Sequence, residues 1–380
     1  MRLLWEKSKK LRPNLKDFQN PFKVFYHLDR IQQLKETGDT RPVHITLGLT
    51  NYCNHRCSWC YINWYQAGRA SQRSGTGDSS RKAISANWTI VEAVGAATEM
   101  GLKAVTIVGD GEPTLHNRFH EILEQLKAYG LDIGLFTNFS TNKPENIEAI
   151  ANSCFFVRGS IDAATPEIHL KSHGTDDFEL VVSNLKNMVN RRGDKLYPII
   201  GIQFVANHNN FQEIYDAAKL FKSLGIDYMT IKPAYKNELN VAHEDNALEL
   251  DHCFEQMRKA ELQSDQKFKV YAKYSQFKEV LQYKTNDSRY YERCYATPLS
   301  PYIDEDGSVE MCGNLKGRGF KLGNVNEQSM RKIWSSVHRQ ECMSRIDLNK
   351  CPSGCKLDPL NKILWDVFHP REEHMHPNFI

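Results

Sequence analysis

Between residues 44 and 233, short runs of apolar and β-branched residues alternate with longer amphipathic stretches. The runs that predict strands are HITLGL (44–49), AVTIVG (104–109), DIGLFT (132–137), FFVRGSI (155–161), IIGIQFV (199–205) and YMTIKP (228–233). Helices are expected where apolar residues recur at three- and four-residue spacing, over 89–100, 118–129, 177–190 and 211–224. Right-handed crossovers place such strands parallel in one sheet. The pattern therefore predicts an α/β fold, a partial (β/α)6 TIM-like barrel with ligands at the C-terminal ends of its strands.

The alternation stops after residue 234, and this change predicts the domain organisation. A charged helical stretch follows at about 246–263, and cysteines return from about residue 291. We expect four parts: an N-terminal extension (1–40), the barrel (41–235), a helical linker (236–290), and a small cysteine-rich domain with a β-hairpin, a helix and a tail (291–380).

Composition narrows the class of protein. A formal charge of +3 over 380 residues favours neither a nucleic-acid binder nor a strongly acidic partner, and we expect no nucleic-acid partner. The basic opening lacks the apolar run of a signal peptide, and no stretch reaches the roughly 18 apolar residues of a membrane span. We therefore expect a cytoplasmic protein without a membrane span. In that reducing compartment, clustered cysteines favour metal or redox chemistry over disulfides.

Three of the ten cysteines, Cys53, Cys57 and Cys60, lie within eight positions directly after the first predicted strand. Three thiolates on one short loop can bind three irons of a [4Fe–4S] cluster and leave the fourth iron open to another ligand. Structural zinc is the alternative, but it requires a fourth ligand, and His55 is tightly enclosed by the motif.

The segment CNHRCSWC, with Trp59 in the aromatic position, resembles the C-x3-C-x-Φ-C motif of the radical S-adenosylmethionine (radical SAM) enzymes. The resemblance implies that the open iron binds the amino and carboxylate groups of S-adenosylmethionine. It also implies a one-electron reductant such as flavodoxin or ferredoxin, whose electron releases a 5′-deoxyadenosyl radical that abstracts hydrogen from a substrate carbon.

The turn GDGEPTLH (109–116) resembles the Gly-Gly-Glu-Pro segment of the same family, with Asp110 in a usual glycine position. The resemblance implies that Gly111, Glu112 and Pro113 meet the cofactor and that Glu112 accepts a hydrogen bond from the methionine ammonium. Ordinary turn chemistry is the alternative explanation for these residues.

Three later segments fall where the family has further cofactor contacts. TNFS (137–140) resembles a Thr-Asn-Gly turn, with Phe139 replacing glycine and Asn138 facing the cofactor or capping the turn. RGSIDAATPE (158–167) resembles the segment that meets the cofactor's carboxylate and ribose, which makes Ser160 and Asp162 contacts, although Asp162 could instead face the substrate. Gln203, on the fifth predicted strand, could point into the barrel.

The C-terminal cysteines frame a predicted hairpin, YIDEDGSVEM, with an Asp-Gly turn. Their arrangement is similar to the SPASM and shorter "twitch" extensions of radical SAM enzymes, which hold auxiliary iron–sulfur clusters. The resemblance implies one auxiliary [4Fe–4S] cluster, with a zinc ribbon as the alternative. Its ligands would be Cys294, Cys312, Cys351 and Cys355.

A full SPASM domain carries C-x2-C-x5-C-x3-C and a further cysteine. Cys342 aligns with the first of this series, but Arg345 takes the second position and no cysteine follows Cys355. We therefore expect a single auxiliary cluster, with Cys342 either left over or substituting for one of its ligands.

Two kinds of catalytic residue are considered. Asp162, Glu112, His116 and His169 are general-base candidates, whereas Gln203 could only orient a substrate. Three other cysteines could donate a hydrogen atom to a substrate radical, as in radical SAM epimerases, or be inert buried thiols. They are Cys154, Cys253 and Cys342.

The first expectation for the substrate is a small molecule, a sugar or sugar-like alcohol that is dehydrogenated or epimerised. Forty residues before the barrel are short for a leader-peptide-binding domain, and the His- and aromatic-rich tail resembles that of radical SAM proteins of sugar metabolism. Modification of a peptide or protein is the alternative reaction, and a structural zinc-binding protein is the non-enzymatic alternative.

Overall fold

The computed structural model describes residues 20–57, 59–60, 84–234, 249–281, 289–351 and 355–370. Within these ranges, no helix combines the length and the apolar character needed to cross a bilayer.

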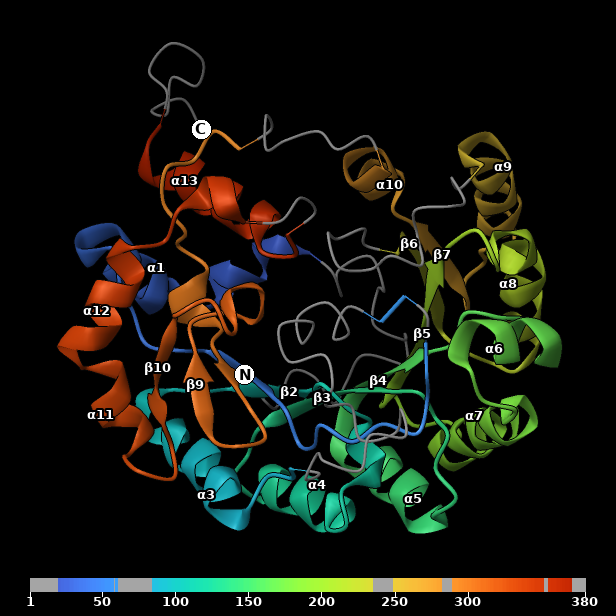
Figure 1. Cartoon of the computed structure of the whole chain (residues 1–380), viewed down its shortest axis with the longest axis horizontal. Coiled ribbons are helices and arrows are strands. Elements are labelled where there is room, and N and C mark those ends of the chain that lie inside the picture. Colours follow the sequence, from blue (N-terminus) through green and yellow to red (C-terminus); the bar gives the residue numbers. More distant parts are fainter. Residues whose placement is uncertain are drawn as a thin grey trace.

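A single ten-stranded sheet organises the chain, in the order β10-β9-β8-β1-β2-β3-β4-β5-β6-β7 (Figure 1). From β1 to β7, neighbouring strands follow chain order and pair in parallel. The strands are β1 (His44–Leu47), β2 (Ala104–Ile107), β3 (Asp132–Thr137), β4 (Cys154–Ser160), β5 (Ile199–Ala206), β6 (Tyr228–Pro233), β7 (Lys269–Ala272), β8 (Tyr302–Ile303), β9 (Ser308–Glu310) and β10 (Lys321–Asn324). The predicted α/β partial barrel and its six strands are confirmed.

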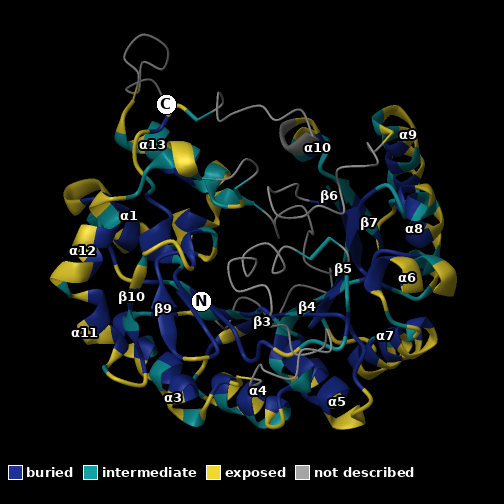
Figure 2. Cartoon of the chain, in the orientation of Figure 1, coloured by how far each residue is buried: buried dark blue, intermediate teal, exposed yellow. Residues whose placement is uncertain are grey.

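Helices cover the outer side of this curved sheet, with their buried faces turned toward it (Figures 1 and 2). Those between the parallel strands are α3 (Trp88–Ala96), α4 (Phe119–Ala128), α5 (Pro144–Ser153), α6 (Pro166–His173), α7 (Phe178–Arg192), α8 (Ile214–Ser223) and α9 (Leu250–Glu261). The remaining helices are α1 (Leu28–Thr37), α10 (Tyr274–Leu281), α11 (Met330–Trp334), α12 (Val337–Ser344) and α13 (Asp358–Phe368).

Local sequence sets where the helices begin and end. The side chain of Asn87 accepts a hydrogen bond from the Ile90 N–H at the start of α3. Thr165 caps α6, whose first residue is Pro166, and Gly174 ends it in the left-handed conformation with a φ of 67°.

Two features of the sheet differ from the sequence expectation. The span 236–290, expected to be a helical linker, contains β7, which pairs with β6. The predicted Asp-Gly hairpin forms as β8 and β9, but β8 also pairs in parallel with β1. The C-terminal hairpin therefore extends the barrel sheet. The domain boundaries themselves stay a prediction.

The described part of the N-terminal extension packs on the C-terminal region. Val24, Ile31 and Leu34 share an apolar cluster with Tyr295 and Leu364. The described N-terminal helices therefore pack against the segment that begins at Tyr295 and against α13.

A buried group of charges joins the hairpin to the turn after β2. Lys316 donates to Asp110 over 2.8 Å and also to Asp304. Burial raises the pKa of Asp304 to about 9 and that of Glu310, near by, to about 7. Lys316 is thus the cation that offsets a cluster of buried carboxyl groups.

Replacing Lys316 with Met should destabilise the protein by about 3–5 kcal/mol, because it leaves buried carboxyl groups without their cation. Chemical denaturation of anaerobically purified protein measures the loss. Lys332→Met, at an exposed position on α11, is the control and should change the free energy of unfolding by less than about 0.5 kcal/mol. Equal stability of the two variants would contradict the importance of this ion pair.

Candidate functional site

The three clustered cysteines lie at the end of β1 where a parallel barrel keeps its ligands. Cys53, Cys57 and Cys60 are all half-buried, and the Cys60 N–H donates to the Cys57 carbonyl over 3.2 Å. Between them, the Arg56 N–H donates to the carbonyl of His173, the last residue of α6, over 2.7 Å. A backbone contact to the unit formed by β4 and α6 therefore helps to hold the cysteine loop.

The turn after β2 is pressed against the same loop. The N–H groups of Gly111 and Glu112 donate to the carbonyls of Thr50 and Tyr52, over 3.0 and 2.8 Å. A Cβ atom at position 111 would lie 2.1 Å from the Tyr52 carbonyl oxygen. Only glycine allows this close approach.

Glu112 is almost fully buried, and it ties the turns after β2 and β3 together. Its Oε1 accepts from the Thr114 N–H and from the hydroxyls of Thr114 and Thr137. Its Oε2 accepts from the Asn138 N–H over 2.7 Å. Oε1 thus accepts from three donors and Oε2 from one, so Oε2 is the oxygen better able to accept a further donor, such as an ammonium group.

The turn after β3 takes the backbone form expected of glycine although it carries Phe139, whose φ is 59°. Its neighbour Asn138 donates to the Asn54 side chain over 2.9 Å and accepts from the Ser140 N–H. Asn138 therefore both caps the turn and contacts the cysteine loop.

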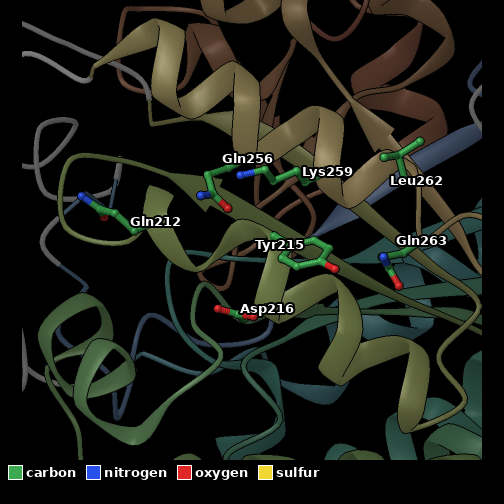
Figure 3. Close-up of a pocket in the computed structure, with 7 residues that line it drawn as sticks. All are labelled: Gln212, Tyr215, Asp216, Gln256, Lys259, Leu262 and Gln263. Atoms are coloured by element: carbon green, nitrogen blue, oxygen red, sulfur yellow. The ribbon is translucent and has the colours of Figure 1, made fainter.

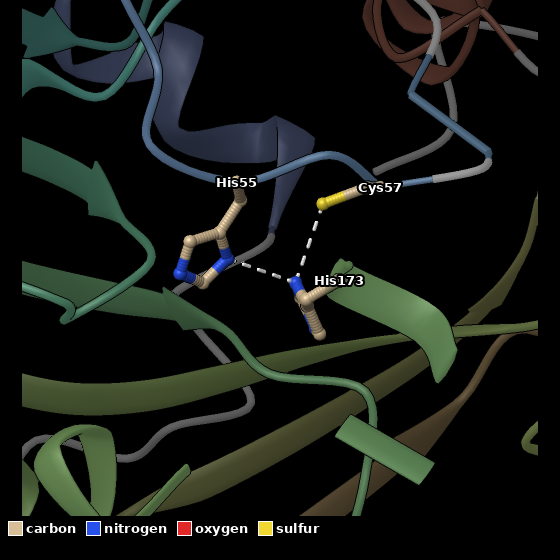
Figure 4. Close-up of side chains that lie close together, drawn as sticks. All are labelled: His55, Cys57 and His173. Atoms are coloured by element: carbon tan, nitrogen blue, oxygen red, sulfur yellow. Dashed lines mark hydrogen bonds between the residues drawn. The ribbon is translucent and has the colours of Figure 1, made fainter. Parts of the chain in front are cut away.

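A histidine approaches the cysteine loop from α6. The Nδ1 atom of His173 lies 3.3 Å from the Cys57 sulfur and 3.2 Å from Nδ1 of His55 (Figure 4). The Trp59 ring meets His173 edge-on, with 5.8 Å between centroids.

Hydrogen bonds to Asp177 and Asp162 orient this group. Asp177 accepts from Nε2 of His55 (3.0 Å) and Nε2 of His169 (2.8 Å). Burial alone would raise the pKa of Asp177, but these bonds hold it far below its usual range. Behind His173, the Asp162 N–H donates to Nε2 over 3.3 Å, and Oδ2 of Asp162 lies 3.1 Å from the same nitrogen.

Burial lowers the pKa of His173, and its contact with Asp162 opposes that shift. If the ring carried a proton on Nε2 alone, the lone pair of Nδ1 would face the Cys57 sulfur. Such an arrangement is repulsive toward a thiolate ligand. A thiolate at Cys57 therefore selects the tautomer with the proton on Nδ1, which can donate an N–H···S hydrogen bond.

The C-terminal thiols also converge. Electrostatic interactions link Cys312 and Cys351 each to Cys294 and Cys355, and burial raises the pKa of Cys312 to about 12 and of Cys351 to about 11. Asn314 donates its backbone N–H to Cys312 and its side-chain amide to Cys355, over 3.3 and 3.6 Å. Four close thiols, of which Cys312 is buried and the others are half-buried, fit either an iron–sulfur cluster or zinc, since either metal centre stabilises the thiolate form.

Comparison with known proteins separates these alternatives. The Radical SAM superfamily model matches residues 47–221, and the model of an iron–sulfur cluster-binding domain, SPASM, matches residues 273–356. The chain therefore carries a radical SAM domain followed by a SPASM domain. Its cofactors are S-adenosylmethionine, a radical-forming [4Fe–4S] cluster and auxiliary iron–sulfur clusters. The two groups of thiols and the carboxylate of Glu112 described above fit these cofactors. The assignment of individual ligands stays a prediction.

Three curated relatives show the breadth of this similarity. A probable GTP 3′,8-cyclase of Thermococcus kodakarensis is 28% identical over an alignment that covers 39% of this chain and only 45% of that protein. A tungsten-containing aldehyde ferredoxin oxidoreductase cofactor-modifying protein of Pyrococcus furiosus is 22% identical, over 77% of this chain and 81% of the relative. The antilisterial bacteriocin subtilosin biosynthesis protein AlbA of Bacillus subtilis is 22% identical, over 84% and 68%.

Among solved structures, Streptococcus suis SuiB bound to S-adenosylmethionine has a TM-score of 0.63 and 16% identity, and the match covers 90% of this chain and 77% of that one. SuiB was also solved with its precursor peptide SuiA, and that structure gives a TM-score of 0.62. At such low sequence identity, these structural similarities show only that the chain shares its fold with SuiB.

Two further cofactor-contact candidates lie next to each other in the superfamily fold. Ser160 at the end of β4 pairs with Gln203 on β5, and both are half-buried. Pro113 is buried and begins a short 3-10 helix, Pro113–Leu115, that positions Thr114 beside Glu112. These placements keep all three residues near the strand ends.

The general-base candidates are mostly engaged by the protein. Asp162 is fully buried, and its Oδ1 accepts from the Val205 N–H. The Nε2 atom of His116 contacts the Ala86 carbonyl, and its Nδ1 accepts from the Arg118 N–H. His169 is fully buried against Asp177. The structure therefore gives these residues positioning contacts within the protein.

The structure does not bring the three hydrogen-donor candidates to the site. Cys154 begins β4 at the end opposite Ser160, roughly 20 Å away at about 3.3 Å per residue. Cys253 is buried on α9 beside Met257. Cys342 is buried on α12, and Arg345 donates to its sulfur over 3.1 Å.

A separate surface pocket lies between α8 and α9, where Tyr215, Asp216, Gln256 and Lys259 line it (Figure 3). Both helices belong to the outer layer, so this pocket is not part of either thiol site.

Sequence reasoning missed several residues that support the sites. His173 and Asp177 carried no motif signal, because they reach the cysteine loop only through the fold. Asn361 on α13, which donates to Cys294 over 3.4 Å, was missed for the same reason.

Removing the radical-cluster ligands should leave the auxiliary cluster in place. Cys53→Ala/Cys57→Ala/Cys60→Ala is expected to lower iron after anaerobic reconstitution from about eight to about four per chain, at four per [4Fe–4S] cluster. Elemental analysis measures this, with Cys154→Ala as the control that keeps all its iron. Zinc in place of iron, or no iron in the triple variant, would contradict two separate clusters.

His173→Leu should make the radical cluster harder to reduce, because N–H···S hydrogen bonds stabilise the more negative, reduced state. An EPR-monitored redox titration would detect a more negative reduction potential. His173→Gln keeps an N–H donor and should recover part of the change, and His120→Leu on the outer helix α4 should have none. An unchanged potential in His173→Leu would disprove this role.

Proposed function

We propose that this protein is a radical SAM enzyme that modifies a peptide or protein. The observation that carries the proposal is the alignment with the bacteriocin biosynthesis protein AlbA over 84% of the chain, barrel and C-terminal domain together. A neighbour of the same fold, SuiB, binds a precursor peptide. The expected sugar substrate has no support in these comparisons, and the peptide alternative fits them better.

The described residues suit distinct parts of this chemistry. S-adenosylmethionine, when bound, supplies the 5′-deoxyadenosyl radical that takes hydrogen from a substrate carbon. Cys53, Cys57 and Cys60 would hold the cluster, while Glu112 and Asn138 would orient the cofactor at the strand ends.

The auxiliary thiols lie close to the interior of the barrel. Lys356 follows Cys355 in the chain and interacts electrostatically with both Cys312 and Lys232, which is on β6. A cluster held there would face the same space as the strand ends, where it could accept an electron or help to hold the substrate.

The proposal predicts that peptides, and not sugars, stimulate cofactor cleavage. Reconstituted enzyme, S-adenosylmethionine and dithionite would be incubated with a pool of synthetic peptides or with a panel of sugars and nucleotide sugars. We expect a rise in 5′-deoxyadenosine and a mass change in a peptide only in the first case. The Cys53→Ala/Cys57→Ala/Cys60→Ala variant should give neither, and a rise confined to the sugars would refute the proposal.

A further inference from the structure

The two faces of β4, β5 and β6 differ sharply in polarity. On the outer face, Ile200, Ile202 and Phe204 are fully buried in the core beneath the helices. Because side chains alternate along a strand, residues at the intervening positions face the inside of the barrel. Those positions hold Arg158, Ser160, Gln203, Thr230 and Lys232.

The strand register arranges these inner residues in rows. Ser160, Gln203 and Thr230 are direct neighbours across β4, β5 and β6. One step further toward the strand ends, Lys232 lies on β6 opposite Val205. Lys273 is beside it, because its N–H donates to the carbonyl of Ile231. Barrel interiors are usually filled with branched aliphatic side chains. We call this inner surface of β4, β5 and β6, with Lys273 beside it, the polar wall, and its polarity requires an explanation.

Below these rows, aromatic rings form a floor that holds Arg158. Its Nε donates to the Tyr228 hydroxyl over 2.9 Å, and its guanidinium lies 4.9 Å from the centre of the Phe136 ring. Tyr228 can lie across β5 only because residue 201 is glycine, where a Cβ would come within 2.1 Å of the ring. The guanidinium is therefore fixed in one place.

The cations on this wall are close enough to affect one another. Burial lowers the pKa of Lys232 to about 8, and repulsion from Arg158 adds to the effect, while Asp162 opposes it. Burial and Arg158 also lower the pKa of Lys273. Among the described residues, neither Arg158 nor Lys273 forms an ion pair with a carboxylate. Arg158 and Lys273 thus add two cations to the wall that no described carboxylate pairs with, whereas Asp162 acts on Lys232.

We infer that Arg158, Lys232 and Lys273 form a subsite for a carboxylate group of the substrate. The subsite rests on the proposed peptide-modifying function and gives it a specificity: an acidic side chain or the C-terminal carboxylate of the peptide. A bound carboxylate would accept charge-assisted hydrogen bonds and relieve the repulsion within the wall. Arg158 presents terminal N–H groups suited to such a partner.

The test uses synthetic ten-residue peptides that share one sequence of Gly, Ala, Ser and Leu, except at two positions that carry either Glu or Gln. Each peptide is made with a free C-terminal carboxylate and with a C-terminal amide. Fluorescence anisotropy of dye-labelled peptide gives the dissociation constant for reconstituted enzyme with S-adenosylmethionine. We expect the Glu peptides to bind about tenfold more tightly than the Gln peptides, as for one charge-assisted hydrogen bond. If the C-terminal carboxylate is the recognised group, the free acids gain this advantage over the amides instead.

In Arg158→Gln and Lys232→Met the advantage should disappear, while Arg158→Lys should keep most of it. Lys186→Gln, at an exposed position on α7, is the matched control and should bind like wild type. Iron content equal to wild type establishes that each variant is folded. Equal binding of all wild-type peptides, or a preference that survives both charge-removing variants, would overturn the subsite.

A second probe separates this subsite from the peptide function. Tricarballylate, a small tricarboxylate, is titrated while intrinsic tryptophan fluorescence is followed. If no peptide binds but tricarballylate binds to wild type at least about tenfold more tightly than to Arg158→Gln, as for one charge-assisted hydrogen bond, the subsite stands and the peptide function fails. If neither probe binds in an Arg158-dependent manner, the subsite is wrong.

Discussion

The contact between the turn after β2 and the cysteine loop fixes the rest of the site. With Gly111 directly beneath the Tyr52 carbonyl, the two backbones lie closer than any side chain would allow. This approach places Glu112 where it can accept from Thr137 and from the Asn138 N–H, and so brings the third strand end into register with the first two. One missing side chain thus sets the relative position of three strand ends before any cofactor binds.

The C-terminal region is attached to the same turn. Asp110, at a glycine position of the Gly-Gly-Glu-Pro pattern that this turn resembles, pairs with Lys316 from the segment after the β8–β9 hairpin. A buried ion pair of this kind adds little net stability compared with apolar packing, but its geometry specifies one arrangement. Since β8 also pairs with β1, the auxiliary thiols are held by the sheet that holds the cysteine loop. The departure at position 110 therefore has a structural reason.

The sequence predicted the barrel because long alternating patterns reflect local periodicity, and it predicted both cysteine sets because their spacing is local too. The strand β7 was missed, since it lies in a charged stretch and Val270 is the one buried residue among its four, so it has no apolar pattern of its own. The β8–β1 pairing joins distant residues, which no local pattern reports. For the same reason, the contact of His173 with the cysteine loop could not be predicted, because it depends on the position of α6. Cys154 was considered for catalysis, although the direction of β4 places it at the end of the strand opposite Ser160.

The polarity of the barrel interior is the clearest sign of function outside the thiol sites. Holding Lys232 and Lys273 near Arg158 costs free energy, because burial and repulsion from Arg158 both disfavour the charged forms of the two lysines. An aliphatic filling would be more stable and would preserve the fold equally well. Natural sequences keep such local conflicts mainly where a ligand resolves them. The fixed guanidinium, its aromatic floor and the glycine that makes room for Tyr228 are the features of a wall shaped around a negatively charged partner.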